Sequence, residues 1–362
     1  MTQGEMLYTE GRLAEAWEAL QREAKEGSGR AMYCIGQYYL FGLGESGEKP
    51  AEAAAWFRRG APSDPMARVM EALFLRLEAV DREALTEAVS AVEKDAEAGS
   101  AEALFCLFAL YSTGVKDVIE ADVPRAQLCC ARAADAGFWQ AEMELGLRLL
   151  NGQSIPKNAE KGAMYLKRAA DKGIGKAEYH LAYCCLAGEG TEKNPSLAVA
   201  YYQKALRHGY FHAAVELGVY YEMGVHVKQD RKKACQLYKR AADRGDAEGR
   251  AHYADCLLAG DVVKRNPRQA AALYQEAAKG GSAYALVRLG ETAFNSGDDG
   301  TAFRYFMEAA QMGMPAAQYL TGLCLLQGRG VSADRRAAAV WLRKAAQNGS
   351  REAGQLLMQF GL

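Results

Sequence analysis

The sequence lacks the features that identify several protein classes. No run of about 18 apolar residues occurs, so no transmembrane helix is predicted. The N-terminal residues contain no basic stretch followed by an apolar core, so no secretory signal is predicted. The 44 Lys and Arg residues balance 45 Asp and Glu residues, whereas nucleic-acid binding favours a basic excess. We therefore expect a cytoplasmic protein whose partners are neither membranes nor nucleic acids.

The common catalytic motifs are also missing. No serine lies in a Gly-x-Ser-x-Gly motif, and no Gly-x-x-x-x-Gly-Lys loop is present. No β-type alternation of useful length occurs, which predicts an all-α protein. Cysteines are numerous but form no C-x-x-C pair, and their number is odd, so we expect free thiols in a reducing compartment. They are Cys34, Cys106, Cys129, Cys130, Cys184, Cys185, Cys235, Cys256 and Cys324.

The dominant feature is a 36-residue repeat. Four regular copies occupy residues 138–173, 174–209, 210–245 and 246–281, and each ends on a glycine. In the first copy, Ala141, Leu145 and Leu149 share one helical face, and Gly152 ends that helix. Asn158 is predicted to cap a second helix, which stops at Gly173. Each copy is therefore predicted to be a helical hairpin that buries its apolar faces only by stacking on its neighbours.

The repeat predicts four segments along the chain. Residues 1–27 form an N-terminal partial repeat, and residues 28–137 form three less regular repeats. Residues 138–349 form six repeats, and residues 350–362 form a C-terminal capping helix with a more polar outer face. Copy 64–99 lacks the glycine loop and has a short predicted turn at Ala79-Val80-Asp81, and copy 282–313 is four residues short.

The motif Leu217-Gly218-x-x-Tyr221-x-x-Gly224-Val225, followed by Asp230-x-x-x-Ala234-x-x-Leu237-Tyr238 and Ala241-Ala242-x-x-Gly245, resembles the Sel1-like repeat. The resemblance covers about nine copies. It implies an all-α, right-handed α-solenoid superhelix of about nine helix-turn-helix repeats with a concave groove. It also implies protein-protein interaction and adaptor roles, often in bacteria. The family has no common catalytic site, so we expect a non-enzymatic protein without a cofactor.

Equal positions in successive copies line up along a solenoid, and three first-helix columns lie away from the core face. In the resembling fold that side lines the groove, and aromatic and Arg side chains dominate interface energetics. We therefore predict that a monomer binds a protein or peptide partner in the groove. The predicted partner-binding residues are Lys176, His180, Tyr183, His212, Glu216, Glu248, His252, Asp255, Tyr284, Arg288 and Glu291. The alternative is a solvated inner face with hydrogen bonds such as His180–Glu216.

Two other functions remain as alternatives. A regulatory subunit, or a metal- or thiol-dependent enzyme, would need a metal site or a reactive cysteine. The pairs His180/Cys184 and His252/Cys256 each share a helix face, but they lie about 20 Å apart at normal helix spacing and supply two ligands each. No metal site is therefore predicted. A chain that self-associates through its degenerate copies is the other alternative. The Tyr and Trp residues at helical spacing are predicted to be core.

Overall fold

The structure is a computed structural model that describes residues 1–43, 49–74 and 81–361. Within these ranges it is all-helical, apart from an isolated bridge between Val115 and Ile119. The predicted turn at residues 79 and 80 lies outside the described residues, and so does Gly44 of the first repeat's loop.

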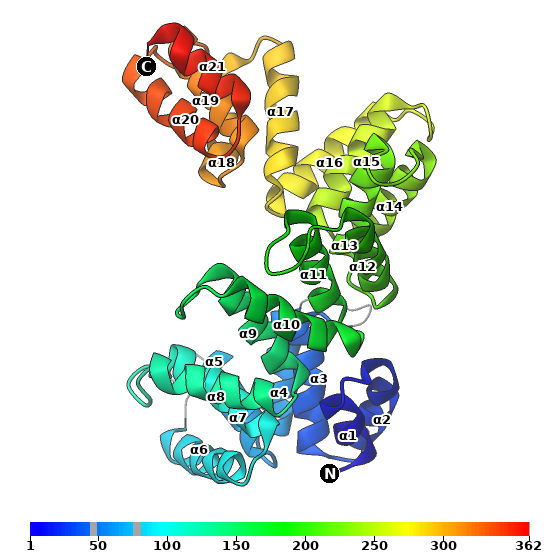
Figure 1. Cartoon of the computed structure of the whole chain (residues 1–362), viewed down its shortest axis with the longest axis vertical. Helices are drawn as coiled ribbons and strands as arrows, with labels where there is room; N and C mark the ends of the chain where they lie inside the picture. The colour runs from blue at the N-terminus through cyan, green and yellow to red at the C-terminus, as the bar shows by residue number, and fades with distance from the viewer. Residues whose placement is uncertain (44–48, 75–80, 362) are drawn as a thin grey trace. The chain divides into compact units, whose positions relative to one another are not determined.

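The helices follow one another as antiparallel pairs (Figure 1). Their bounds are α1 Gln3–Thr9, α2 Leu13–Lys25, α3 Gly29–Phe41, α4 Pro50–Gly60, α5 Pro65–Phe74, α6 Arg82–Glu97, α7 Ala101–Thr113, α8 Val123–Asp135, α9 Trp139–Asn151, α10 Ala159–Asp171, α11 Gly175–Ala187, α12 Pro195–Arg207, α13 His212–Met223, α14 Arg231–Asp243, α15 Ala247–Ala259, α16 Pro267–Lys279, α17 Ala283–Asn295, α18 Asp299–Gln311, α19 Pro315–Gln327, α20 Arg335–Gln347 and α21 Arg351–Phe360.

The predicted caps begin the second helix of each regular hairpin. The side chain of Asn158 accepts a hydrogen bond from the backbone N–H of Lys161 at 3.0 Å, which satisfies one of the free donors of the first turn of α10. The equivalent caps are Asn194, Asp230 and Asn266, which bond to Leu197, Lys233 and Gln269. Gly152 ends α9 with a positive φ of 67°, a conformation that glycine adopts without strain.

Small residues bring the two helices of a hairpin close together. Gly218 of α13 faces the ring of Tyr238 of α14, and a Cβ at position 218 would lie 2.3 Å from Cε1 of that ring. Gly36 faces Phe57, and Gly290 faces Phe306, at similar distances. The repeat therefore needs a small residue here, because a large ring of the second helix packs over this point.

The chain forms two compact units, Met1–Ala213 and Ala214–Leu362. The first unit holds α1 to α12, and its core includes the fully buried Trp139, Tyr8 and Tyr33. In the second unit, apolar clusters join α15 to α17, α17 to α19, and α20 to α21. The terminal helix α21 exposes Met358 and Phe360 beside polar residues, so its outer face is only partly polar.

Candidate interaction surface

The predicted groove residues of the first unit lie on α11 and at the start of α13. Lys176 and His180 are half-buried, whereas Tyr183 is 56% exposed and His212 is exposed. Burial, together with the positive charge of Lys176, lowers the pKa of His180 to about 4, so this imidazole is neutral at pH 7. The ring of His212 lies 5.2 Å from that of Tyr210. Tyr183 and His212 are therefore the accessible rings of this group.

The other predicted residues belong to the second unit. Two of them, Glu216 and Glu248, are half-buried. The pKa of Glu248 is raised because burial disfavours its carboxylate, and a hydrogen bond with Ser282 opposes the shift. The remaining five lie on α15 and α17 and form one connected group: His252, Asp255, Tyr284, Arg288 and Glu291.

His252 is the centre of an aromatic stack. Its ring lies 4.7 Å from that of Tyr238 at an interplanar angle of 17°, and 4.6 Å from that of Tyr284 at 18°. Its pKa is lowered because burial outweighs the attraction of Asp255, so the ring is uncharged at neutral pH. Three parallel rings from α14, α15 and α17 thus form a continuous column, which holds each ring in one orientation.

Asp255 ties three helices together. It accepts hydrogen bonds from the hydroxyls of Tyr274 at 2.5 Å and Tyr284 at 2.7 Å, and from Nε of Arg288 at 3.0 Å. Nη2 of Arg288 lies 2.9 Å from the same carboxylate, and its Nη1 pairs with Glu291 at 2.6 Å. The pKa values of both tyrosines are raised, first by burial and then by these bonds to Asp255. This arrangement fixes α15, α16 and α17 through charge-assisted bonds.

Three residues that belong to this group or contact it were not among the predicted site residues: Tyr238, Tyr274 and Glu222. Tyr238 and Tyr274 were predicted to be core, and their rings are buried, but their hydroxyls reach Glu222 at 2.7 Å and Asp255 at 2.5 Å. The sequence contains one indication of these polar roles, which is a tyrosine at one position of the second helix in three copies. Tyr202, Tyr238 and Tyr274 stand where other copies have Phe57, Leu166, Phe306 and Leu342. A hydroxyl added to an apolar column needs a polar partner when buried.

A pocket of about 390 Å³ opens beside this group within the second unit. Its charged lining comprises Glu222, Arg231, Asp255, Asp261 and Arg288, and the ring of Tyr238 forms part of its wall. Three carboxylates thus face two guanidinium groups. The volume lies near the lower end of the range for ligand pockets.

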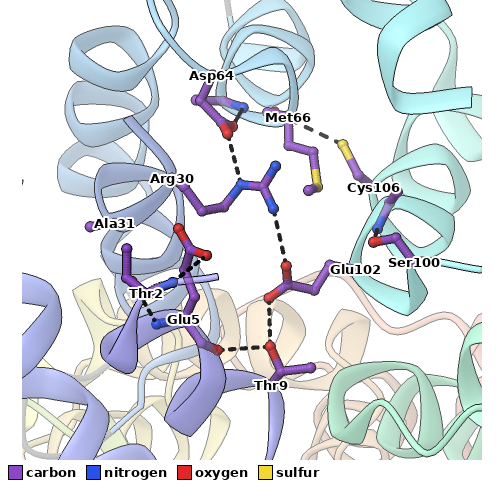
Figure 2. A network of polar contacts seen from close by, with 12 residues as sticks. Thr2, Glu5, Thr9, Arg30, Ala31, Asp64, Met66, Ser100, Glu102 and Cys106 are labelled. Atoms are coloured by element: carbon purple, nitrogen blue, oxygen red, sulfur yellow. Dashed lines mark hydrogen bonds and ion pairs between the residues drawn. The ribbon is translucent and has the colours of Figure 1, made fainter. Parts of the chain in front are cut away.

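In α1, α3 and α7 of the first unit, residues of the inner columns pack on one another instead of lining an open surface. Nε of Arg30 lies 2.7 Å from Asp64, and its Nη1 lies 3.3 Å from Glu102, two repeats further on. The hydroxyl of Thr9 donates to Glu102 at 3.1 Å (Figure 2). Arg30 and Glu102 occupy the same repeat position as Lys176 and Glu248. In α3 and α7 that position therefore points inward and makes internal contacts, whereas His212 at the same position is exposed.

Helix α1 completes this packing. The indole Nε1 of Trp139 donates to the backbone carbonyl of Tyr8 at 3.0 Å, although 131 residues separate them. The rings of Trp139 and Phe41 meet at 6.3 Å, and the side-chain amide of Gln140 donates to Gln37 at 3.4 Å. Helices α1, α3 and α9 thus meet directly, and the first-helix residues between them are buried.

Neither a metal site nor a reactive thiol stands out. No group of three or more His, Cys, Asp or Glu residues that suits a metal ion occurs in residues 1–43, 49–74 and 81–361. All nine cysteines are free, and burial raises the pKa of each thiol, whereas a nucleophilic cysteine needs a lowered pKa. Among the described helices, none combines the length and apolarity that crossing a bilayer requires.

A family model described as "Sel1 repeat" matches seven stretches of the chain. These are residues 29–61, 101–138, 139–174, 175–210, 211–246, 247–282 and 315–350. Copy 64–99 and residues 283–313 of copy 282–313 fall between the matched stretches, as the departures of these copies from the repeat motif predict. A comparison with curated protein sequences finds no match.

Two solved structures share the fold over most of the chain. One is a protective antigen of uropathogenic Escherichia coli with an SLR fold; it is 27% identical, with a TM-score of 0.58, and the match covers 93% of this chain and 73% of the antigen. The other is a Sel1 repeat protein from Oxalobacter formigenes; it is 26% identical, with a TM-score of 0.51, and the match covers 84% of this chain and 89% of the relative. Repeat folds of this type generally serve as protein-interaction scaffolds and are typically non-enzymatic.

Proposed function

Because the chain belongs to the Sel1 repeat family, we propose that it is a non-enzymatic adaptor that holds a peptide or protein segment against the inner first-helix face of its second unit. The single observation that carries this proposal is the rigid group built around His252 and Asp255, which presents aromatic and Arg side chains without burying them completely. Arg288 remains 34% exposed in its side chain, and Glu291 41%.

The side chains of this group are ordered before a partner binds, which lowers the entropy cost of binding. Binding normally costs about 0.5–1.5 kcal/mol for each mobile side chain that becomes ordered. Here the three stacked rings and the four contacts of Asp255 order the side chains before any partner arrives. Tyr and Arg are also the residue types in which binding hot spots are enriched. A partner segment would therefore meet a surface that needs little rearrangement.

A separate set of predicted contacts lies within the first unit. Tyr183 and His212 carry accessible rings, and Lys176 and His180 lie on the same helix as Tyr183. The internal packing of α1, α3, α7 and α9 occupies the equivalent positions earlier in the chain, which favours the later repeats as the binding part. The balanced charge favours a protein partner over nucleic acid. We infer a cytoplasmic bacterial protein that acts as a monomer.

The proposal is tested by truncating three side chains of the predicted surface. A triple variant with Tyr183, His252 and Arg288 changed to Ala should lose captured partners in quantitative affinity purification from the source cell. The matched control is a triple variant with Met164, Leu197 and Val340 changed to Ala, because these are exposed side chains of second helices. Helicity of both variants is checked by circular dichroism.

The expected result is loss of the same partners from the first variant and their full recovery with the control. Equal recovery by both variants, with helicity intact, would overturn the proposal and move the interaction to the second-helix face or to the ends. Identification of the partner would then define the segment that binds, which can be tested as a synthetic peptide against the same two variants.

A further inference from the structure

One charged side chain in the lining of the pocket beside the aromatic stack, Glu222, has no ion-pair partner among the described residues. Both guanidinium groups in its lining are already paired, Arg231 with Asp261 and Arg288 with Asp255. Glu222 is different: one carboxylate oxygen accepts the hydroxyl of Tyr238 at 2.7 Å, and no cation pairs with it among the described residues. The lining therefore carries an excess of negative charge that an anionic ligand would increase and a cation would neutralise.

The carboxylate of Glu222 is positioned to accept more donors. A carboxylate offers about four lone-pair sites, and Tyr238 uses one of them. The same hydroxyl orients the carboxylate, because the ring that carries it is fixed between Gly218 and His252. The other lining residues include Ala234, Leu258 and Val262, which give the pocket apolar wall suited to methylene groups. The pocket thus combines an apolar wall with one oriented, unpaired carboxylate.

We propose that this pocket is a subsite for an arginine side chain of the partner segment, with Glu222 as the residue that binds the guanidinium group. The inference rests on the proposed function for the source of the arginine, but the subsite itself is defined by the pocket. A guanidinium group is planar, donates in a fork that matches a carboxylate, and is more weakly hydrated than an ammonium group. It therefore tolerates desolvation beside Arg231 and Arg288 better than lysine does.

The test uses small probes and the full-length chain. Nα-acetyl-arginine amide is titrated into the isotopically labelled protein, and binding is followed by amide chemical shifts near residues 255–262. Nα-acetyl-citrulline amide is the neutral probe of nearly the same shape, and Nα-acetyl-lysine amide is the alternative cation. Only the arginine probe should produce saturable shifts at these residues, and added salt should weaken its binding.

The variant E222Q should weaken binding of the arginine probe by on the order of tenfold, because the ion pair is replaced by a hydrogen bond from the guanidinium group to an uncharged amide oxygen. The matched control is E308Q, which removes an exposed carboxylate from α18 and should leave the affinity unchanged. Y238F keeps the ring and removes the orienting hydroxyl, so it should weaken binding less than E222Q.

Three results would overturn the subsite: equal binding of the citrulline probe, equal or tighter binding of the lysine probe, or equal affinities of E222Q and E308Q. These results are independent of partner capture. If the variant of Tyr183, His252 and Arg288 loses its partner but the arginine probe does not bind, the subsite fails and the adaptor function stands. If the probe binds through Glu222 but partner capture is unaffected by that variant, the subsite stands and the adaptor surface fails.

Discussion

Replacing Asp255 with Asn tests whether this carboxylate organises the second unit. The substitution keeps the shape of the side chain but removes its charge and turns one acceptor into a donor, which would face a hydroxyl or a guanidinium group. Hydrogen bonds to a charged group are worth about 1.5–3 kcal/mol each and are not additive. Because the side chains of Asp255 and Arg288 are 24% and 34% exposed, solvent replaces part of the loss. We expect D255N to destabilise the contact between α15 and α17 by about 2 kcal/mol.

Hydrogen exchange measured by mass spectrometry reports this loss locally. A loss of 2 kcal/mol corresponds to roughly 30-fold faster hydrogen exchange of the backbone amides that become exposed when the contact between α15 and α17 breaks. Peptides from α15 and α17 should show this change, whereas peptides from α3 in the first unit should not. The control is D243N, because Asp243 pairs with Lys239 at a site where both side chains are more than half exposed. That pair is expected to contribute no more than about 0.5 kcal/mol.

The reasoning would be refuted if α15 and α17 exchanged at the same rates in D255N and D243N. Such a result would mean that the four contacts of Asp255 are replaced by water at little cost, and that the stacked rings alone hold the helices. Faster exchange across the whole chain would refute it in another way, because the effect would then not be confined to the group around Asp255.

Three further predictions concern packing, pH and thiols. G218A should lower the free energy of unfolding by about 1–3 kcal/mol, because its Cβ would lie 2.3 Å from the ring of Tyr238. The control G354A has open space around position 354 and should be neutral or stabilising. Equal urea midpoints of the two variants would contradict this prediction. The lowered pKa of His180, about 4 against about 6.5 unfolded, means that its contribution is complete above pH 6.5 and is lost as the pH falls toward 4. H180Q should therefore reduce the loss of stability between pH 7 and pH 4.5 by about 2.5 kcal/mol, and an unchanged pH profile would exclude this role. The native thiols, all with raised pKa values, should react with iodoacetamide at pH 7 at least roughly tenfold more slowly than in urea; one fast thiol would restore the enzyme alternative.

The helical hairpins and their ends were predictable because local chemistry determines them. Asn158 caps α10 and Gly152 ends α9 through bonds made within a few residues, so the sequence pattern contains the whole cause. The position of the small residue follows from the same local pattern, since the 36-residue period repeats it as Gly146, Ala182, Gly218 and Ala254. Membership of the Sel1 repeat family follows from this local pattern.

The roles of the polar groups were harder to predict because their partners lie in other repeats. Tyr274 reads as core from its helix alone, and only the approach of α17 shows that its hydroxyl shares Asp255 with Tyr284. The unpaired carboxylate of Glu222 likewise follows from the pairing of the arginines around it. Partner identity, which these groups are proposed to serve, is a property of the surface and is not contained in the repeat motif.

The sequence by itself determined that this chain is an all-α array of hairpins, because caps, glycine stops and apolar periodicity act over fewer than about ten residues. Only the tertiary structure decided which inner residues remain available. In the early repeats of the first unit, Trp139 reaches the carbonyl of Tyr8 and Arg30 reaches Glu102, so the inner positions of α1, α3, α7 and α9 are used for internal contacts. In the second unit, Tyr284, at the same repeat position as Arg30 and Glu102, belongs to a partly exposed group around Asp255. The difference depends on contacts between repeats, which no single repeat contains.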